Sequence, residues 1–142
     1  MLDFYTPKTF YVLPGTNCWV KIATIKVTDS YANTPICFDL SHRGSRDLYH
    51  ITLLFLNSGN LDPDINVFGC NISTTTIYLY KREVSTWDLY IHKSEAYDSI
   101  SIVKYYYDYE YLGRKIKINF FTQGEYCKDS DLPDGGIYPT LI

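Results

Sequence analysis

The sequence predicts an all-β protein, an antiparallel β-sandwich of jelly-roll-like architecture. Aromatic residues make up 17% of the 142 residues, and 15 of them are tyrosines, which pack well in sheets. Short apolar runs alternate with turn signals at intervals of roughly 10–15 residues, which is typical of antiparallel sandwiches. No segment has a convincing helical pattern. The length fits one domain.

The first half of the chain contains three expected strands. Residues 19–27 form a run rich in β-branched residues. Residues 36–40 alternate apolar with polar or small residues, the two-residue period of a half-buried strand. Residues 47–57 form the most apolar run, and we expect a central strand buried on both faces.

The second half adds further strands, which brings the expected number to seven or eight. Two of them alternate clearly, with Tyr78 and Tyr80 opposed to Ile77 and Leu79 in the first. After residue 122 the chain resembles a loop, because turn residues dominate. The expected strands of this half are residues 65–70, 74–81, 86–92, 99–107 and 115–121.

The chain divides into a short arm and one domain. Residues 1–14, with Pro7 and Pro14, are expected to form an N-terminal arm leading in from a preceding region, and residues 15–142 to form the β-sandwich domain. Large side chains at alternating strand positions are expected to form the core. They are Trp19, Phe38, Phe55, Trp87 and Phe120.

Charge and hydropathy exclude several classes of protein. The net charge is −3, and no run of Lys or Arg exceeds two residues, so nucleic acid is not an expected partner. No run of 18 apolar residues predicts a membrane-spanning helix, and we expect no membrane insertion. The first residues lack the basic and apolar regions of a signal peptide, which indicates either synthesis in a reducing cytosol or a fragment of a longer chain.

The sequence predicts no metal site and no cofactor. His42, His50 and His92 do not have the spacing that places two imidazoles on one metal. The cysteines contain no C-x-x-C pair, and no glycine-rich phosphate loop is present. Free and disulfide-bonded thiols both remain compatible with Cys18, Cys37, Cys70 and Cys127.

No catalytic residue is predicted either. The sequence has no G-x-S-x-G motif, which would expose a serine nucleophile on a strained turn. A pair of carboxylates suited to glycoside cleavage cannot be recognised from sequence, since it depends on their separation. We therefore expect a protein that is not an enzyme.

The tyrosines near residue 107 are the most suggestive group. We expect Tyr105, Tyr107, Tyr109 and Tyr111 to project from one face at the end of a strand and in the following hairpin, with Tyr106 on the other face. Tyrosine is suited to recognition surfaces and to stacking on sugar rings. The same rings could instead pack between subunits or cover a sheet edge. Both interpretations imply a partner, because an exposed row of this size is adhesive.

Two short motifs carry a resemblance to a known group of proteins. They are W-x-K-I-A at residues 19–23 and T-W-D-L-Y at residues 86–90. Read together, they resemble the C-terminal domains of bacteriophage tail fibres, tail spikes and related receptor-binding proteins. The resemblance spans residues 19–136. Further matching features are the strand at residues 36–40, the Arg43-Gly44 turn, the apolar strand ending at Phe55, Leu132-Pro133 and Gly135-Gly136.

The resemblance implies a β-sandwich head, usually a homotrimer, at the tip of a virion fibre. Such a head binds a host cell-surface glycan or protein receptor without catalysis, and it would be synthesised in the host cytoplasm. Residues 1–14 would then be the junction to a preceding fibre region. The resemblance carries over no ligand-binding residue, so the tyrosine assignment depends only on residue chemistry.

Two alternatives remain open from the sequence. The first is a monomeric carbohydrate-binding module of a protein unrelated to phages. The second is a tail-associated polysaccharide hydrolase.

Overall fold

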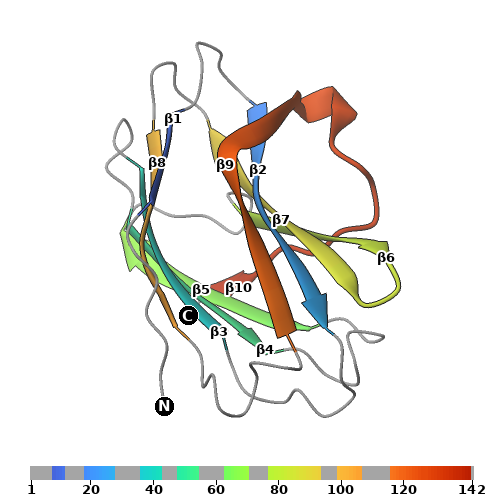
Figure 1. Ribbon diagram of the computed structural model, residues 1–142, viewed down its shortest axis with the longest axis horizontal. Helices are drawn as coiled ribbons and strands as arrows, with labels where there is room; N and C mark the ends of the chain where they lie inside the picture. Colours follow the sequence, from blue (N-terminus) through green and yellow to red (C-terminus); the bar gives the residue numbers. More distant parts are fainter. Residues whose placement is uncertain are drawn as a thin grey trace.

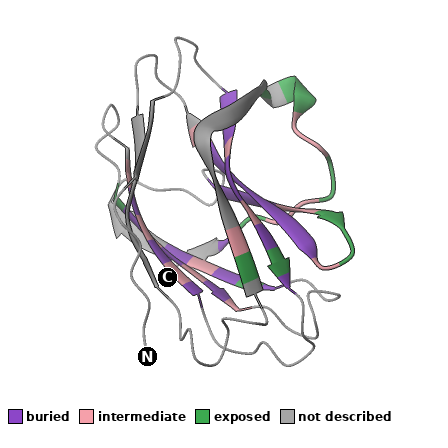
Figure 2. Cartoon of the chain, viewed as in Figure 1, coloured by how far each residue is buried: buried purple, intermediate pink, exposed green. Residues whose placement is uncertain are grey.

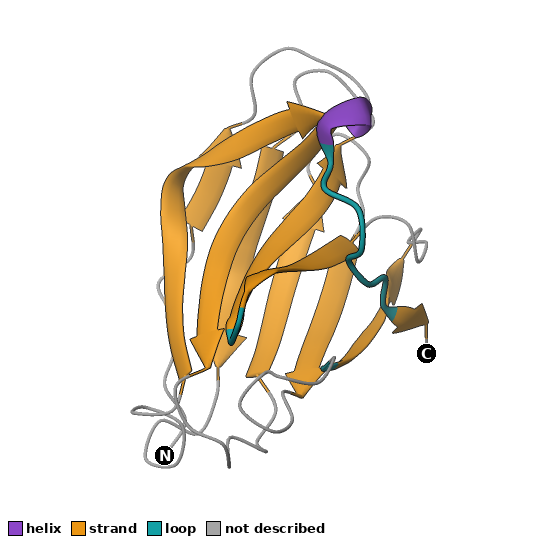
Figure 3. Ribbon diagram, turned by 90° about the vertical axis from the view of Figure 1, so that its right-hand side faces the viewer, coloured by secondary structure: helices purple, strands orange, loops and turns teal. Residues whose placement is uncertain are grey.

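The computed structural model describes residues 8–11, 18–27, 36–42, 48–54, 63–70, 77–93, 99–106 and 116–141. Within these ranges the chain consists of strands and loops, with one short 3₁₀ helix, η3 (Asp129–Asp131) (Figures 1 and 3). The predicted all-β fold is confirmed. No helix in these ranges is long and apolar enough to cross a bilayer.

The strands form two sheets. One has six strands in the order β1-β8-β3-β4-β5-β10, and the other has four in the order β6-β7-β2-β9. All neighbours are antiparallel except β5 and β10, which are parallel. The strands are β1 (Lys8–Tyr11), β2 (Cys18–Val27), β3 (Ile36–His42), β4 (Leu48–Leu54), β5 (Asp64–Cys70), β6 (Ile77–Glu83), β7 (Thr86–Lys93), β8 (Ser99–Tyr106), β9 (Ile116–Lys128) and β10 (Thr140–Leu141).

The two sheets face each other across one apolar core (Figure 2). Ile25 and Trp87 from the four-stranded sheet belong to the same buried cluster as Phe38 and Ile51 from the six-stranded sheet. Each fully buried large apolar side chain contributes about 1.5–3 kcal/mol to folding. Burial of alternate residues on both sheets therefore holds the layers together.

The predicted core is confirmed in part. Phe38 and Trp87 are fully buried between the sheets. Trp19 is also buried, but it belongs to a separate cluster outside the main core. Phe55 and the side chain of Phe120 lie outside what the structure describes.

The expectation that the strand near residue 51 is buried on both faces is wrong. Tyr49, Ile51 and Leu53 of β4 are buried, whereas Leu48 is 55% exposed and the other residues between them are partly exposed. Only one face of the six-stranded sheet packs against the other sheet. The apolar run in the sequence therefore reflects a strand that is buried on one face only and has leucines on its outer face as well.

The expectation of a loop after residue 122 is wrong for residues 123–128, because β9 continues to Lys128, and is confirmed for residues 132–136. The pairing with β2 is irregular at this point: Ala23 pairs with Phe120, whereas Lys21 pairs with Glu125. Residues 121–124 thus lie opposite the single residue Ile22 as a large bulge. Bulged residues do not follow the strand period, so their sequence resembles a loop.

The region expected to be an N-terminal arm contains β1, which pairs with β8. The expected hairpin after Tyr106 is wrong. Strand β8 lies between β1 and β3 in the six-stranded sheet, and β9 lies beside β2 in the other. Residues 107–115 therefore join strands of different sheets instead of closing a hairpin.

Candidate recognition surface

The outer face of the four-stranded sheet is the most chemically distinctive surface. On β7, Leu89 and Ile91 point into the core, so Asp88 and Tyr90 lie on the opposite, outer face. The register places Tyr78 of β6 beside Tyr90. Directly opposed residues of an antiparallel pair project from the same face, so aromatic side chains gather there.

Three of these rings form a buried aromatic platform, defined here as Trp19, Tyr78 and Tyr90. The ring centroids of Trp19 and Tyr78 are 5.7 Å apart, and those of Tyr78 and Tyr90 are 6.3 Å apart. His92 packs edge-on against Trp19 at 4.9 Å. These distances are typical of favourable aromatic pairs. The exposed fractions of Trp19, Tyr78 and Tyr90 are only 5%, 4% and 9%, so the platform itself is covered.

Residues 132–138 lie over the aromatic platform and are called here the cover segment. Leu132 packs on the platform. Ile137 pairs with Leu79 of β6 through two backbone hydrogen bonds of 2.9 and 2.8 Å. Figure 3 shows this part of the chain leaving η3 and running across the sheet towards β10.

The hydroxyl of Tyr78 fixes the cover segment to the platform. It donates a hydrogen bond to the carbonyl oxygen of Pro133 and accepts one from the backbone N–H of Gly136, both at 2.6 Å. Gly136 has to be a glycine here, because a Cβ atom would lie 2.2 Å from Cζ of Tyr78. Burial raises the pKa of Tyr78, and the bond from Gly136 offsets part of that rise. The hydroxyl thus remains protonated and can donate.

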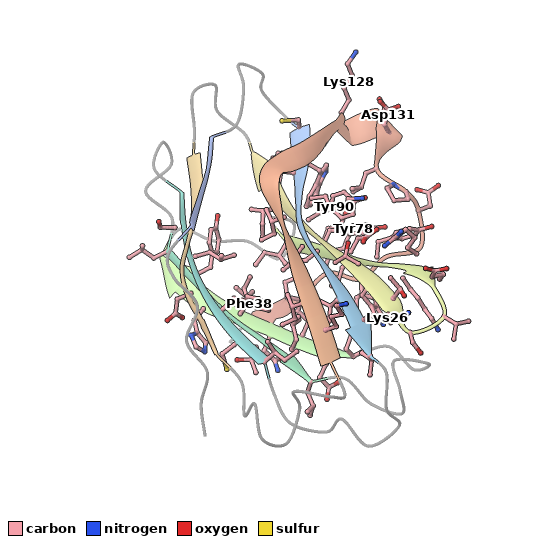
Figure 4. The ribbon with its side chains drawn as sticks, in the orientation of Figure 1. Lys26, Phe38, Tyr78, Tyr90, Lys128 and Asp131 are labelled. Carbon is pink, nitrogen blue, oxygen red and sulfur yellow. The ribbon has the colours of Figure 1, made fainter. Side chains whose placement is uncertain are left out.

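Tyr138 is the exposed aromatic residue of this surface. Its ring is 47% exposed and lies 5.1 Å from the ring of Tyr78 and 6.4 Å from that of Trp19. Asp131 and Asp134 are exposed nearby in the same part of the chain, and Figure 4 shows Asp131 beyond Tyr78 and Tyr90. An exposed ring on a fixed support can bind a ligand without first being ordered.

A buried carboxylate lies beside the aromatic platform. The side chain of Asp88 is 2% exposed, and its Oδ1 accepts a hydrogen bond of 2.8 Å from the Thr24 hydroxyl. Its Oδ2 lies 3.1 Å from Nε of Arg82 and 3.9 Å from Nζ of Lys21. Two cations therefore share this carboxylate.

The outer face of the six-stranded sheet carries a second polar group. Nδ1 of His50 lies 2.5 Å from Oδ1 of Asp39, across the β3–β4 pair. Beside it, Sγ of Cys37 lies 4.0 Å from the hydroxyl of Thr52. These two contacts define a polar surface on β3 and β4. No cluster of metal-ligating side chains occurs in the part of the chain that the structure describes.

The tyrosines selected from sequence are placed only in part. Tyr105 lies in β8, in register with Phe38 of β3. Tyr107, Tyr109 and Tyr111 lie outside the described residues, so their assignment remains a prediction.

The aromatic platform was missed by sequence reasoning, although its signal was present. The alternation at residues 77–80 and 86–92 separates tyrosines from core residues on each strand. Neither pattern shows that the two strands are neighbours in register, which is what brings Tyr78 beside Tyr90. The cover segment gave no periodic signal at all. Tyr138 could therefore not be identified as part of a site.

Comparison with known proteins adds no family to this description. The resemblance to phage receptor-binding domains therefore continues to depend on the short sequence motifs at residues 19–23 and 86–90. No protein-family model, curated protein or solved structure matches this chain.

Proposed function

We propose that this protein is a non-catalytic recognition domain, the receptor-binding head of a phage tail fibre, and that it binds a saccharide of the bacterial surface. The observation that carries the proposal is the half-exposed ring of Tyr138, supported from below by Tyr78 and Trp19. The two-layered, all-β fold supports the sandwich head that the sequence resemblance implies.

The chemistry of this surface suits a sugar. The flat apolar face of a tyrosine packs on the C–H face of a pyranose ring, and few rotatable bonds are immobilised when it does so. The carboxylates of Asp131 and Asp134 can accept hydrogen bonds from sugar hydroxyls. Because Tyr138 packs against buried rings, its position is set before the ligand arrives.

A binding measurement with matched variants tests the proposal. The wild-type protein and Tyr138→Ala are applied to an array of bacterial surface oligosaccharides and polysaccharides. We expect Tyr138→Ala to weaken binding about tenfold or more, as expected for loss of a central aromatic contact. Val84→Ala is the control, because Val84 is 72% exposed at the β6–β7 turn and belongs to neither buried cluster.

The same array separates this surface from the one selected by sequence. Tyr107→Ala and Tyr109→Ala should bind like the wild type if Tyr138 marks the site. Loss of binding in those variants, with none in Tyr138→Ala, would move the site to the tyrosine-rich connection. Absence of binding to every glycan would contradict saccharide recognition, and shortening of a bound polysaccharide on incubation would instead favour a hydrolase.

A further inference from the structure

The outer face of the four-stranded sheet carries exposed lysines at the end that lies away from the aromatic platform. Lys26 of β2 and Lys117 of β9 are direct partners in the antiparallel register. Both side chains are exposed, and both lie away from the core, since Ile25, Val27 and Ile118 pack into it. Their Cα atoms are thus about 4.5–5.5 Å apart, the usual separation of paired residues.

Like charges placed directly opposite each other destabilise a sheet. Neither Lys26 nor Lys117 forms an ion pair with any residue that the structure describes. Lys21 and Arg82, further along the same face, share the single carboxylate of Asp88. Lys26 and Lys117 therefore place two adjacent positive charges on this face of a protein whose net charge is −3.

One carboxylate offsets part of this charge. Glu83 is exposed at the end of β6 and pairs in register with Thr86, the residue that pairs with Lys26 on the other side. Within the described residues, Glu83 forms no ion pair with either lysine. Two lysines and one carboxylate leave this end of the face cationic.

The basic and aromatic ends are separated along β2. Lys26 follows Trp19, which contacts Tyr138, by seven positions. At about 3.3 Å per residue this is roughly 20 Å, several times the size of one sugar ring. Figure 4 shows Lys26 and the rings of Tyr78 and Tyr90 at separate positions along the same sheet.

We infer that the ligand is an anionic saccharide polymer that lies along this face. One sugar ring packs on Tyr138, and a carboxylate or phosphate further along the chain lies between Lys26 and Lys117. The inference rests on the proposed function and specifies its ligand class. The anion removes the repulsion between the two lysines, so their placement stabilises the complex more than the free protein.

The test compares polymers that differ in charge. The probes are polygalacturonate, its neutral methyl ester, poly(glycerol phosphate) and duplex DNA, with affinity measured by biolayer interferometry. The variants are the double substitution Lys26→Gln/Lys117→Gln and the control Lys128→Gln, which removes a positive charge from an exposed residue at the other end of β9.

We expect an acidic polymer to bind more tightly than the methyl ester, and the double variant to lose about tenfold in affinity, which corresponds to about 1.4 kcal/mol. Lys128→Gln should bind like the wild type. Binding of polygalacturonate would identify the anion as a carboxylate, and binding of poly(glycerol phosphate) would identify it as a phosphate. The melting temperature of the double variant should equal or exceed that of the wild type, because a like-charge pair is removed.

Other results overturn the inference. Equal binding of the ester and the acid, an unchanged affinity of the double variant, or no binding of either acidic polymer would each exclude an anionic saccharide at Lys26 and Lys117. The proposed function would survive these results if a neutral glycan on the array still required Tyr138. Equally tight binding of DNA, independent of Tyr138, would indicate a general polyanion surface and would also overturn the inference.

Discussion

The hydroxyl of Tyr78 shows how one atom can hold a recognition surface in place. It satisfies two backbone groups of the cover segment, the carbonyl of Pro133 and the N–H of Gly136. The ring beneath it contacts Trp19, Tyr90 and Tyr138. Loss of the hydroxyl would leave the two backbone groups without that partner while the ring packing remained.

We therefore expect Tyr78→Phe to lower the free energy of unfolding by about 1–3 kcal/mol, the cost of leaving buried polar groups unsatisfied. Urea denaturation followed by tryptophan fluorescence measures this change. Tyr138→Phe is the control, because Tyr138 is half-exposed and water can replace its hydroxyl contacts. An equal loss of stability in both variants would contradict the special role of Tyr78.

The same residue predicts a dependence of stability on pH. Burial raises the pKa of Tyr78 above its ordinary value of 10.0 in the folded protein. The folded state thus holds this proton more tightly than the unfolded state, so the contribution is complete below about pH 10 and falls as the pH rises through the folded pKa. The decline above pH 10 should be shallower in Tyr78→Phe, and an identical slope would contradict this assignment.

At the scale of elements, β7 combines a core face with a charged outer face. Asp88 lies on this strand between Trp87 and Leu89, which are buried on the other side. Thr24 on β2 and Arg82 on β6 both contact its carboxylate. The carboxylate therefore joins three adjacent strands of the sheet.

We expect Asp88→Asn to destabilise the protein by about 1–2 kcal/mol, because the charge that Arg82 and Lys21 share is lost while the Thr24 contact can persist. The loss is small because Arg82 is half-exposed and water screens its charge. Thermal unfolding measures the effect. Glu83→Gln, at an exposed position, should leave the melting temperature unchanged, and an equal shift in both variants would refute a specific role for Asp88.

Strands with a strict two-residue period could be predicted from sequence. On β3, Ile36, Phe38 and Leu40 are buried and the residues between them are partly exposed, as the alternation indicates. The prediction failed where a second influence hides the period. Apolar residues on the outer face disguise the one-sided burial of β4, and the bulge at residues 121–124 disguises the continuation of β9.

The candidate site was harder to predict than the strands. Its rings come from β2, β6 and the cover segment, and only the register between distant strands brings Trp19 near Tyr78. The tyrosine cluster near residue 107 was conspicuous because its members are adjacent in sequence. Contacts across a sheet do not give such a local signal, so the sequence pattern indicates a different region.

At the scale of the whole molecule, the proposed function makes a prediction about assembly. A fibre head is built around a three-fold axis, so the protein should sediment with three times its chain mass of 16.5 kDa. Analytical ultracentrifugation over a dilution series measures this mass. A single-chain mass at every concentration would contradict the fibre head and would favour a monomeric carbohydrate-binding module.

The path of residues 137–141 has a consequence for folding in the cell. Ile137 pairs with the edge strand β6 of one sheet, and β10 then pairs with β5 in the other. Because residues 137–141 follow β5 and β6 in the sequence, a nascent chain on the ribosome exposes the edges of these two strands until residues 137–141 have been synthesised. Unpaired edges are templates for intermolecular strand pairing. The interval before residues 137–141 are synthesised is thus when these edges are most prone to aggregation, and a ribosome-associated chaperone would protect the chain most then.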